Sequence, residues 1–177
     1  MKYFNPETFK NIPSVMRVTR NGFKAAVLTN VFQNDAYTEL AKHYPPLSLF
    51  HHFKDEYKNV FEGPYYDAKE FKGCVNHFSA IDSMWKEVLR EANSDEFVRL
   101  FNSSTGIAFN SVRNFSWKYG VEGCEIKPHL DQAAMSGNAS ASRIVCMFYF
   151  SSRPRGGPGG TCIYDVDRTT ILLEPKD

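Results

Sequence analysis

The sequence predicts an α+β fold in which helices come first and strands follow, and three observations support this. Between residues 81 and 92, apolar side chains recur every three or four positions, the period of an amphipathic helix. At Phe115, Trp117 and Tyr119, aromatic side chains alternate with polar ones, the period of a strand. Residues 144–150 (IVCMFYF) form a nearly continuous apolar run, typical of a strand buried on both faces.

These patterns predict a single domain with two parts, because 177 residues are enough for one core. Residues 1–106 are expected to be mainly helical, and residues 107–177 are expected to form the strands. A run of helices followed by a run of strands indicates helices packed on a sandwich or barrel.

In the first part, we expect a helix over residues 35–43, with Asn34 as its cap and the two prolines at 45 and 46 ending it. A second helix is expected over 81–92. A third, short helix is expected to begin after Ser94 and to run to about Phe101, before the Ser-Ser-Thr-Gly segment at 103–106. Residues 47–78 are aromatic and polar without a steady period, and we expect them to be irregular.

In the second part, the strand ending at Tyr119 is expected to lead into a glycine-bearing turn at 120–123. The 144–150 strand is followed by a Gly- and Pro-rich turn at 154–160. Residues 161–164 and 170–173 are expected to form two more short strands.

Composition excludes several classes of function. The formal net charge is +1 and there is no dense run of Lys or Arg, so neither a nucleic acid nor a membrane surface is expected as a partner. No apolar stretch is long enough for a signal peptide or a bilayer span, which favours a cytoplasmic protein. The 4 cysteines form no CxxC pair, so no zinc knuckle or disulfide framework is indicated.

The residues that could carry chemistry are His129 and Asp131. On an extended segment, residues two positions apart point to the same side, so an imidazole nitrogen and a carboxylate oxygen converge. With a second histidine from elsewhere, such a pair forms the facial triad of non-haem iron(II) oxygenases. A His-x-Asp triplet alone is a weak signal, and its neighbours in the sequence have to support it.

Those neighbours occur in a recognisable order. Tyr119-Gly120 precedes His129, Arg143 opens the apolar strand that contains Tyr149, and Gly159-Gly160 leads into the next strand. Over about residues 94–175, this series resembles the prolyl-4-hydroxylase-like branch of the 2-oxoglutarate/Fe(II)-dependent dioxygenase superfamily. The resemblance implies N-terminal helices packed on a double-stranded β-helix (jelly roll).

The resemblance also implies a set of site residues and cofactors. His129 and Asp131 would hold Fe(II), and Tyr119 and Tyr149 would line the pocket of the cosubstrate 2-oxoglutarate. A phenol suits this role because it can hydrogen-bond a carboxylate from an otherwise apolar wall. No further catalytic residue is assigned. An aspartate as the second ligand favours hydroxylation over halogenation.

The sequence departs from the family pattern after residue 173. No histidine follows His129, and the chain ends at Asp177, before the expected third ligand and the basic residue that pairs with 2-oxoglutarate. We therefore expect a jelly roll that is incomplete at the C-terminus, and a 177-residue chain that is inactive although its parent is an enzyme. Exposed strand edges would then favour a homo-oligomer.

Two other classes of protein remain open. The first is a non-catalytic jelly-roll binding module that lacks the third metal ligand. The second is a cupin-like metal enzyme or sugar isomerase, which is less favoured because such sites gather several histidines on one strand pair. The substrate of an oxygenase could be peptidyl or a small molecule, since fold resemblance does not select between them.

Overall fold

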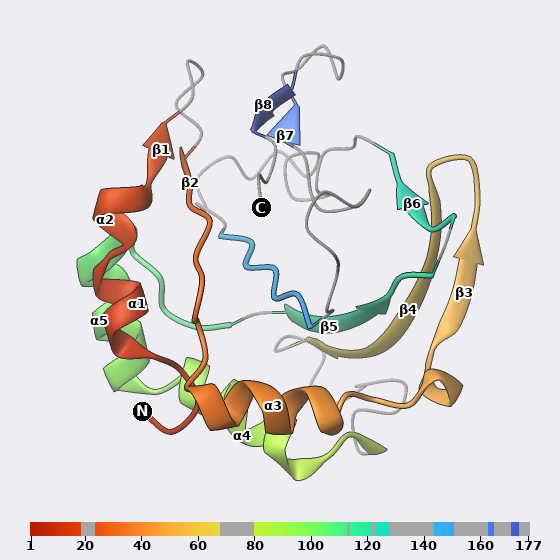
Figure 1. Ribbon diagram of the computed structural model, residues 1–177, viewed down its shortest axis with the longest axis horizontal. Helices are drawn as coiled ribbons and strands as arrows, with labels where there is room; N and C mark the ends of the chain where they lie inside the picture. Colours follow the sequence, from red (N-terminus) through yellow and green to blue (C-terminus); the bar gives the residue numbers. More distant parts are fainter. Residues whose placement is uncertain are drawn as a thin grey trace.

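The computed structural model describes residues 1–18, 24–67, 80–112, 114–121, 123–127, 144–150, 163–164 and 171–173, and these show a mixed α+β arrangement of helices and small antiparallel sheets. The helices are α1 (Pro6–Lys10), α2 (Ile12–Val15), α3 (Asn34–Lys42), η1 (a 3-10 turn, Leu47–Leu49), α4 (Ser83–Ala92) and α5 (Asp95–Thr105). The strands are β1 (Arg17–Val18), β2 (Lys24–Ala25), β3 (His51–Lys54), β4 (Lys58–Asp67), β5 (Asn114–Tyr119), β6 (Glu125–Ile126), β7 (Ile163–Tyr164) and β8 (Ile171–Leu173). In Figure 1, α1, α2 and α5 lie at the left, α3 and α4 along the bottom, and β3 to β6 at the right.

The three predicted helices are present, with shifted ends. Helix α3 begins at Asn34 itself, with Gln33 as the N-cap and no capping bond from its side chain, so the prediction that Asn34 is the cap is wrong by one residue. Ser94 does cap α5, because its side chain accepts a hydrogen bond from the amide of Phe97. Helix α5 continues to Thr105 and ends at Gly106, whose φ of 66° lies in the left-handed region.

The largest sheet contains two strands that the sequence did not predict. Strands β3 and β4 form an antiparallel hairpin within residues 47–78, so the expectation that this region is irregular is wrong for 51–54 and 58–67. Its strand order is β3-β4-β5, and β6 also pairs with β4. The first part of the chain is therefore not only helical, because it supplies the central strand of this sheet.

Register divides this sheet into two faces. Phe61 pairs with Tyr119 and Tyr66 pairs with Phe115, so these side chains share the face of Trp117. Trp117 packs edge-on against Trp85 of α4, with ring centroids 5.5 Å apart, and this face is therefore turned toward the helices. The opposite face, which we call the far face, carries His51, Glu62, Tyr65, Ser116 and Lys118.

The core is an aromatic layer between the helices and the sheet. Trp85, Phe4, Leu40 and Val88 are almost completely buried, at 2% exposure or less. Phe4 contacts Phe9, Phe32 and Phe97 at centroid distances of 4.7–5.8 Å, which joins the N-terminal segment to α1 and α5. Because buried aromatic rings contribute large apolar areas, this layer supplies much of the driving force for folding.

Residues 144–150 cross this layer, but they do not form a strand buried on both faces as predicted. Phe148 and Phe150 pack against Phe32 at 5.2 and 5.5 Å, and Phe150 also packs against Trp85 at 5.3 Å. Val145, Met147 and Tyr149 are 54–62% exposed. The segment is therefore covered on the side of the helices alone, and it has no β partner among the described residues.

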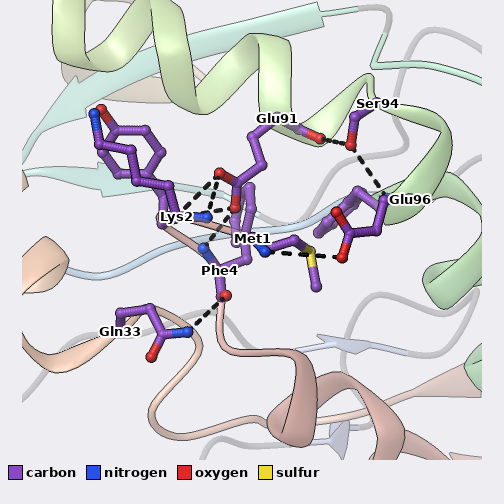
Figure 2. A network of polar contacts seen from close by, with 9 residues as sticks. Met1, Lys2, Phe4, Gln33, Glu91, Ser94 and Glu96 are labelled. Carbon is purple, nitrogen blue, oxygen red and sulfur yellow. Dashed lines mark hydrogen bonds and ion pairs between the residues drawn. The ribbon is translucent and has the colours of Figure 1, made fainter.

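The N-terminal residues are held by one carboxylate of α4. Glu91 accepts hydrogen bonds from the backbone amides of Lys2, Tyr3 and Phe4 at 2.8–3.0 Å (Figure 2). On its other side this segment pairs with residues 31–33, where the backbone N–H of Gln33 donates to the backbone carbonyl of Tyr3 at 2.8 Å. Glu91 thus satisfies three amides that no helix or sheet would otherwise use.

The remaining predicted elements are partly described. The two short strands predicted at 161–164 and 170–173 are confirmed as β7 and β8, which pair antiparallel. The glycine turn after β5 is also present, since Gly123 has a φ of 79° and the Cys124 amide donates to the Val121 carbonyl at 3.0 Å. The turn predicted at 154–160 lies outside the described residues. Within the described part of the chain, none of the helices has the length and apolar character needed to cross a membrane.

A bulge interrupts β4 at Gly63-Pro64. Glu62 pairs with Lys118 and Tyr65 pairs with Ser116, so β4 has one residue more than β5 over this interval. A Cβ atom at Gly63 would lie 2.5 Å from the ring of Phe50, which is buried. Glycine is therefore required here by the close approach of an aromatic ring.

We predict that Gly63→Ala destabilises the protein by roughly 1–3 kcal/mol, because the new methyl group overpacks against Phe50. The measurement is urea unfolding of the variant and the parent. In a double-mutant cycle, Phe50→Leu should cost less in the Gly63→Ala background than in the parent, since it relieves the clash. Additive costs would contradict this explanation.

Candidate functional site

The two predicted metal ligands, His129 and Asp131, lie outside the described residues. Among the residues that are described, no group of three or more His, Cys, Asp or Glu side chains is arranged to hold a metal ion. Both predicted cosubstrate residues, Tyr119 and Tyr149, are among the residues that the structure describes.

Tyr119 is the last residue of β5 and lies on the face turned toward the helices. Its ring meets the ring of Phe50 edge-on at 6.0 Å, and its register partner on β4 is Phe61. The side chain is 40% exposed because it stands at the end of the strand. Tyr119 thus borders the aromatic layer, with its ring against apolar neighbours.

Tyr149 points in the opposite direction. Phe148 and Phe150, on either side of it, are directed at the helices, so the alternation of an extended chain turns Tyr149 away from them. Its ring is 56% exposed, and its hydroxyl lies 3.9 Å from the sulfur of Met147. The structure places Tyr119 and Tyr149 on opposite sides of the layer, and Tyr149 is the one on the side of the far face.

Tyr44 contacts the residue next to each of these two tyrosines, Lys118 beside Tyr119 and Phe150 beside Tyr149. The sequence did not single it out as a site residue. Its hydroxyl donates to the carbonyl of Lys118 at 2.7 Å, and its ring packs on Trp85 and Phe150 at 6.1 Å each. Burial raises the pKa of Tyr44 to about 12, with a smaller opposing effect of the bond to Lys118. The hydroxyl therefore stays protonated and joins the end of β5 to the segment that follows α3.

A charged group on the far face was also missed by the sequence analysis. Lys58 Nζ lies 3.0 Å from Glu62 Oε1, and Lys118 Nζ approaches the same oxygen to 3.9 Å. Lys58 and Glu62 are about 30% exposed, while Lys118 is 51% exposed. The signal was hidden because a spacing of four residues has no special meaning until both residues are known to lie on one strand face.

A second polar pair joins the end of α3 to the start of α4. His43 Nδ1 lies 2.9 Å from Asp82 Oδ2, and the other oxygen of Asp82 caps α4 by accepting from the Met84 amide at 2.8 Å. The bond from Met84 is the main reason that the pKa of Asp82 is lowered, and the nearby His43 adds to it. This pair lies on the surface and is structural in role.

The chain matches no family model, no curated protein and no solved structure.

We predict that Tyr44→Phe lowers the free energy of unfolding by about 1 kcal/mol, the net worth of one hydrogen bond. The ring contacts are kept in this variant, so the loss isolates the bond to the Lys118 carbonyl. Chemical denaturation measures the change. Tyr37→Phe in α3 is a suitable control, because the ring of Tyr37 also packs on Phe150, and an equal loss in both variants would contradict a special role for Tyr44.

We predict a pH dependence at the start of α4. The folded-state pKa of Asp82 is lowered from its ordinary value of 3.8, so its stabilising effect is present above that value and is lost as the pH falls through the lowered pKa. Asp82→Asn keeps a capping side chain but removes the charge. The difference in Tm between the parent and this variant should shrink on acidification below pH 3.8. A difference in Tm that is constant with pH would contradict the prediction.

Proposed function

We propose that this chain is an Fe(II)- and 2-oxoglutarate-dependent dioxygenase (hydroxylase) domain of the prolyl-4-hydroxylase-like type. The observation that carries the proposal is the position of His129 and Asp131 in the chain. They lie between a strand that ends at Tyr119 and the extended segment 144–150. Both elements pack on the same helical layer through Trp85, which is consistent with two neighbouring strands of a double-stranded β-helix.

The donor set suits the metal. An imidazole nitrogen and a carboxylate oxygen on one extended segment are two of the three protein ligands of a facial triad, and Fe(II) accepts both types. When bound together, Fe(II) and 2-oxoglutarate supply an oxidising power that depends on dioxygen and yields succinate and carbon dioxide. The third protein ligand is not assigned to any residue of this chain.

The residues of this chain would position the cosubstrate. In this proposal Tyr149 donates a hydrogen bond from its hydroxyl to a carboxylate of 2-oxoglutarate, since it points away from the helices and is not enclosed by the core. Tyr119 lies on the other side of the aromatic layer, with its ring against Phe50, so the proposal assigns the contact with 2-oxoglutarate to Tyr149. Phe148 and Phe150 hold the segment that carries Tyr149 by packing into the aromatic layer.

Binding of Mn(II), a redox-stable substitute for Fe(II), tests the proposal most directly. In the presence of 2-oxoglutarate, calorimetry should detect Mn(II) binding that His129→Ala or Asp131→Ala weakens by more than about tenfold, because each change removes a ligand. His43→Ala is the matched control, because it also removes a histidine that lies beside an aspartate, Asp82, and this pair is not part of the proposed metal site. Binding that is the same in all four proteins would overturn the assignment.

Tyr149→Phe separates the cosubstrate role from the metal role. It should weaken 2-oxoglutarate binding in the presence of Mn(II), while Mn(II) binding without 2-oxoglutarate stays unchanged. Undiminished 2-oxoglutarate affinity in this variant would remove Tyr149 from the pocket. Absence of any metal-dependent 2-oxoglutarate binding by the parent chain would instead favour a non-catalytic binding module.

A further inference from the structure

The far face of the sheet carries two ammonium groups beside one carboxylate. The three groups come from neighbouring strands, since Lys58 and Glu62 lie on β4 and Lys118 is the register partner of Glu62 on β5. Lys58 and Lys118 both approach Oε1 of Glu62, at 3.0 and 3.9 Å. At neutral pH the group therefore keeps one positive charge that Glu62 does not neutralise.

Lys118 supplies most of the unused binding capacity. Its ammonium carries three donors, and at 3.9 Å from Glu62 it is too far away for a hydrogen bond. Within the described residues, this ion pair is the only polar contact of its side chain. Lys58 is held more firmly, because it is bonded to Glu62 and its ammonium also lies 4.8 Å from the ring centroid of Phe53.

The backbone below this group is fixed on both strands. Tyr44 bonds the carbonyl of Lys118 from the helical side, and Phe50 packs on Gly63 directly after Glu62. The bulge at Gly63-Pro64 begins at the same point, and bulges of this kind commonly set the direction of a side chain. The ammonium groups thus project from a rigid support, which lowers the entropy lost when a ligand binds.

We propose that Lys58 and Lys118 form a binding site for an anionic group, a carboxylate or a phosphate, on the far face of the sheet. Glu62 neutralises one of the two ammonium charges and competes with the ligand for them, and the excess positive charge attracts the ligand. The site goes beyond the proposed oxygenase activity and does not depend on it. Its ligand would be a substrate or effector that carries a negative charge, distinct from 2-oxoglutarate.

The test is a titration of the metal-free chain with acetate and, separately, with inorganic phosphate, followed by amide chemical shifts in NMR spectra. Shifts should saturate at Lys58, Glu62 and Lys118. Lys118→Met should weaken binding about fivefold, the equivalent of about 1 kcal/mol for one charge near 4 Å in water. Tighter binding of phosphate than of acetate would assign the ligand to the phosphate class, and the reverse order would assign it to the carboxylate class.

The decisive variant is Glu62→Gln, which should strengthen anion binding about fivefold because the competing carboxylate is gone. The matched control is the pair Lys42 and Glu39 on α3, which lie 2.6 Å apart, with His43 Nε2 4.0 Å from the other oxygen of Glu39. Lys42→Met and Glu39→Gln should leave the affinity unchanged. Weaker or unchanged binding in Glu62→Gln would overturn the proposal, provided that its Tm shows a folded protein. Lys118→Met covers the case in which Glu62→Gln does not fold, and unchanged binding in that variant overturns the proposal equally.

A competition experiment separates this site from the proposed cosubstrate pocket. Addition of 2-oxoglutarate with Mn(II) should not displace the anion from Lys118. Displacement would mean that Lys118 belongs to the cosubstrate pocket, and the separate site would be rejected. Loss of metal binding in His129→Ala with anion binding intact would leave this site standing independently of the oxygenase proposal.

Discussion

The indole of Trp85 joins the helices of the first part of the chain to the strands of the second. Its ring is 1% exposed and lies 5.5 Å from Trp117 on β5 and 5.3 Å from Phe150. Its Nε1 donates to the carbonyl of His43 at 2.8 Å, so it also closes the end of α3. Helix α4, the sheet and segment 144–150 therefore meet at this one side chain.

This packing gives the sheet two different faces. The face toward Trp85 is aromatic, and its side chains hold the fold together. The far face carries the charges of Lys58, Glu62 and Lys118, and Tyr149 is directed to the same side from the neighbouring segment. The aromatic layer and the charged group therefore lie on opposite faces of the sheet, although Val60, also on the far face, is buried.

The sequence predicted the elements whose signal is local. The helical period at α4 and the Ser94 cap of α5 are properties of a few neighbouring residues, and both were confirmed. The hairpin β3–β4 was missed because all of β3 is exposed and shows no apolar alternation, and because the Gly63-Pro64 bulge breaks the alternation of β4. Segment 144–150 was expected to be covered on both sides because nearly all of its residues are apolar. Its Val145, Met147 and Tyr149 are nevertheless exposed, since composition alone does not tell which side of a segment is covered by other residues. For the site, local spacing identified His129 and Asp131 as candidates, but the group around Glu62 depends on register across strands.

The bulge in β4 also determines how this strand tolerates changes in length. Before the bulge, Glu62 faces away from the helices, and after it Tyr65 does so as well, although the two are three positions apart. If β4 alternated regularly from Glu62 onward, Tyr65 would face the helices and Tyr66 would face away from them. Loss of one residue at 63–64 would straighten the ladder with both tyrosines still on their present sides, whereas loss of one residue elsewhere in β4 would reverse every side chain on one side of the gap. Within β4, a single-residue deletion therefore leaves every side chain on its present face of the sheet when it falls at 63–64, where the strand has its extra residue.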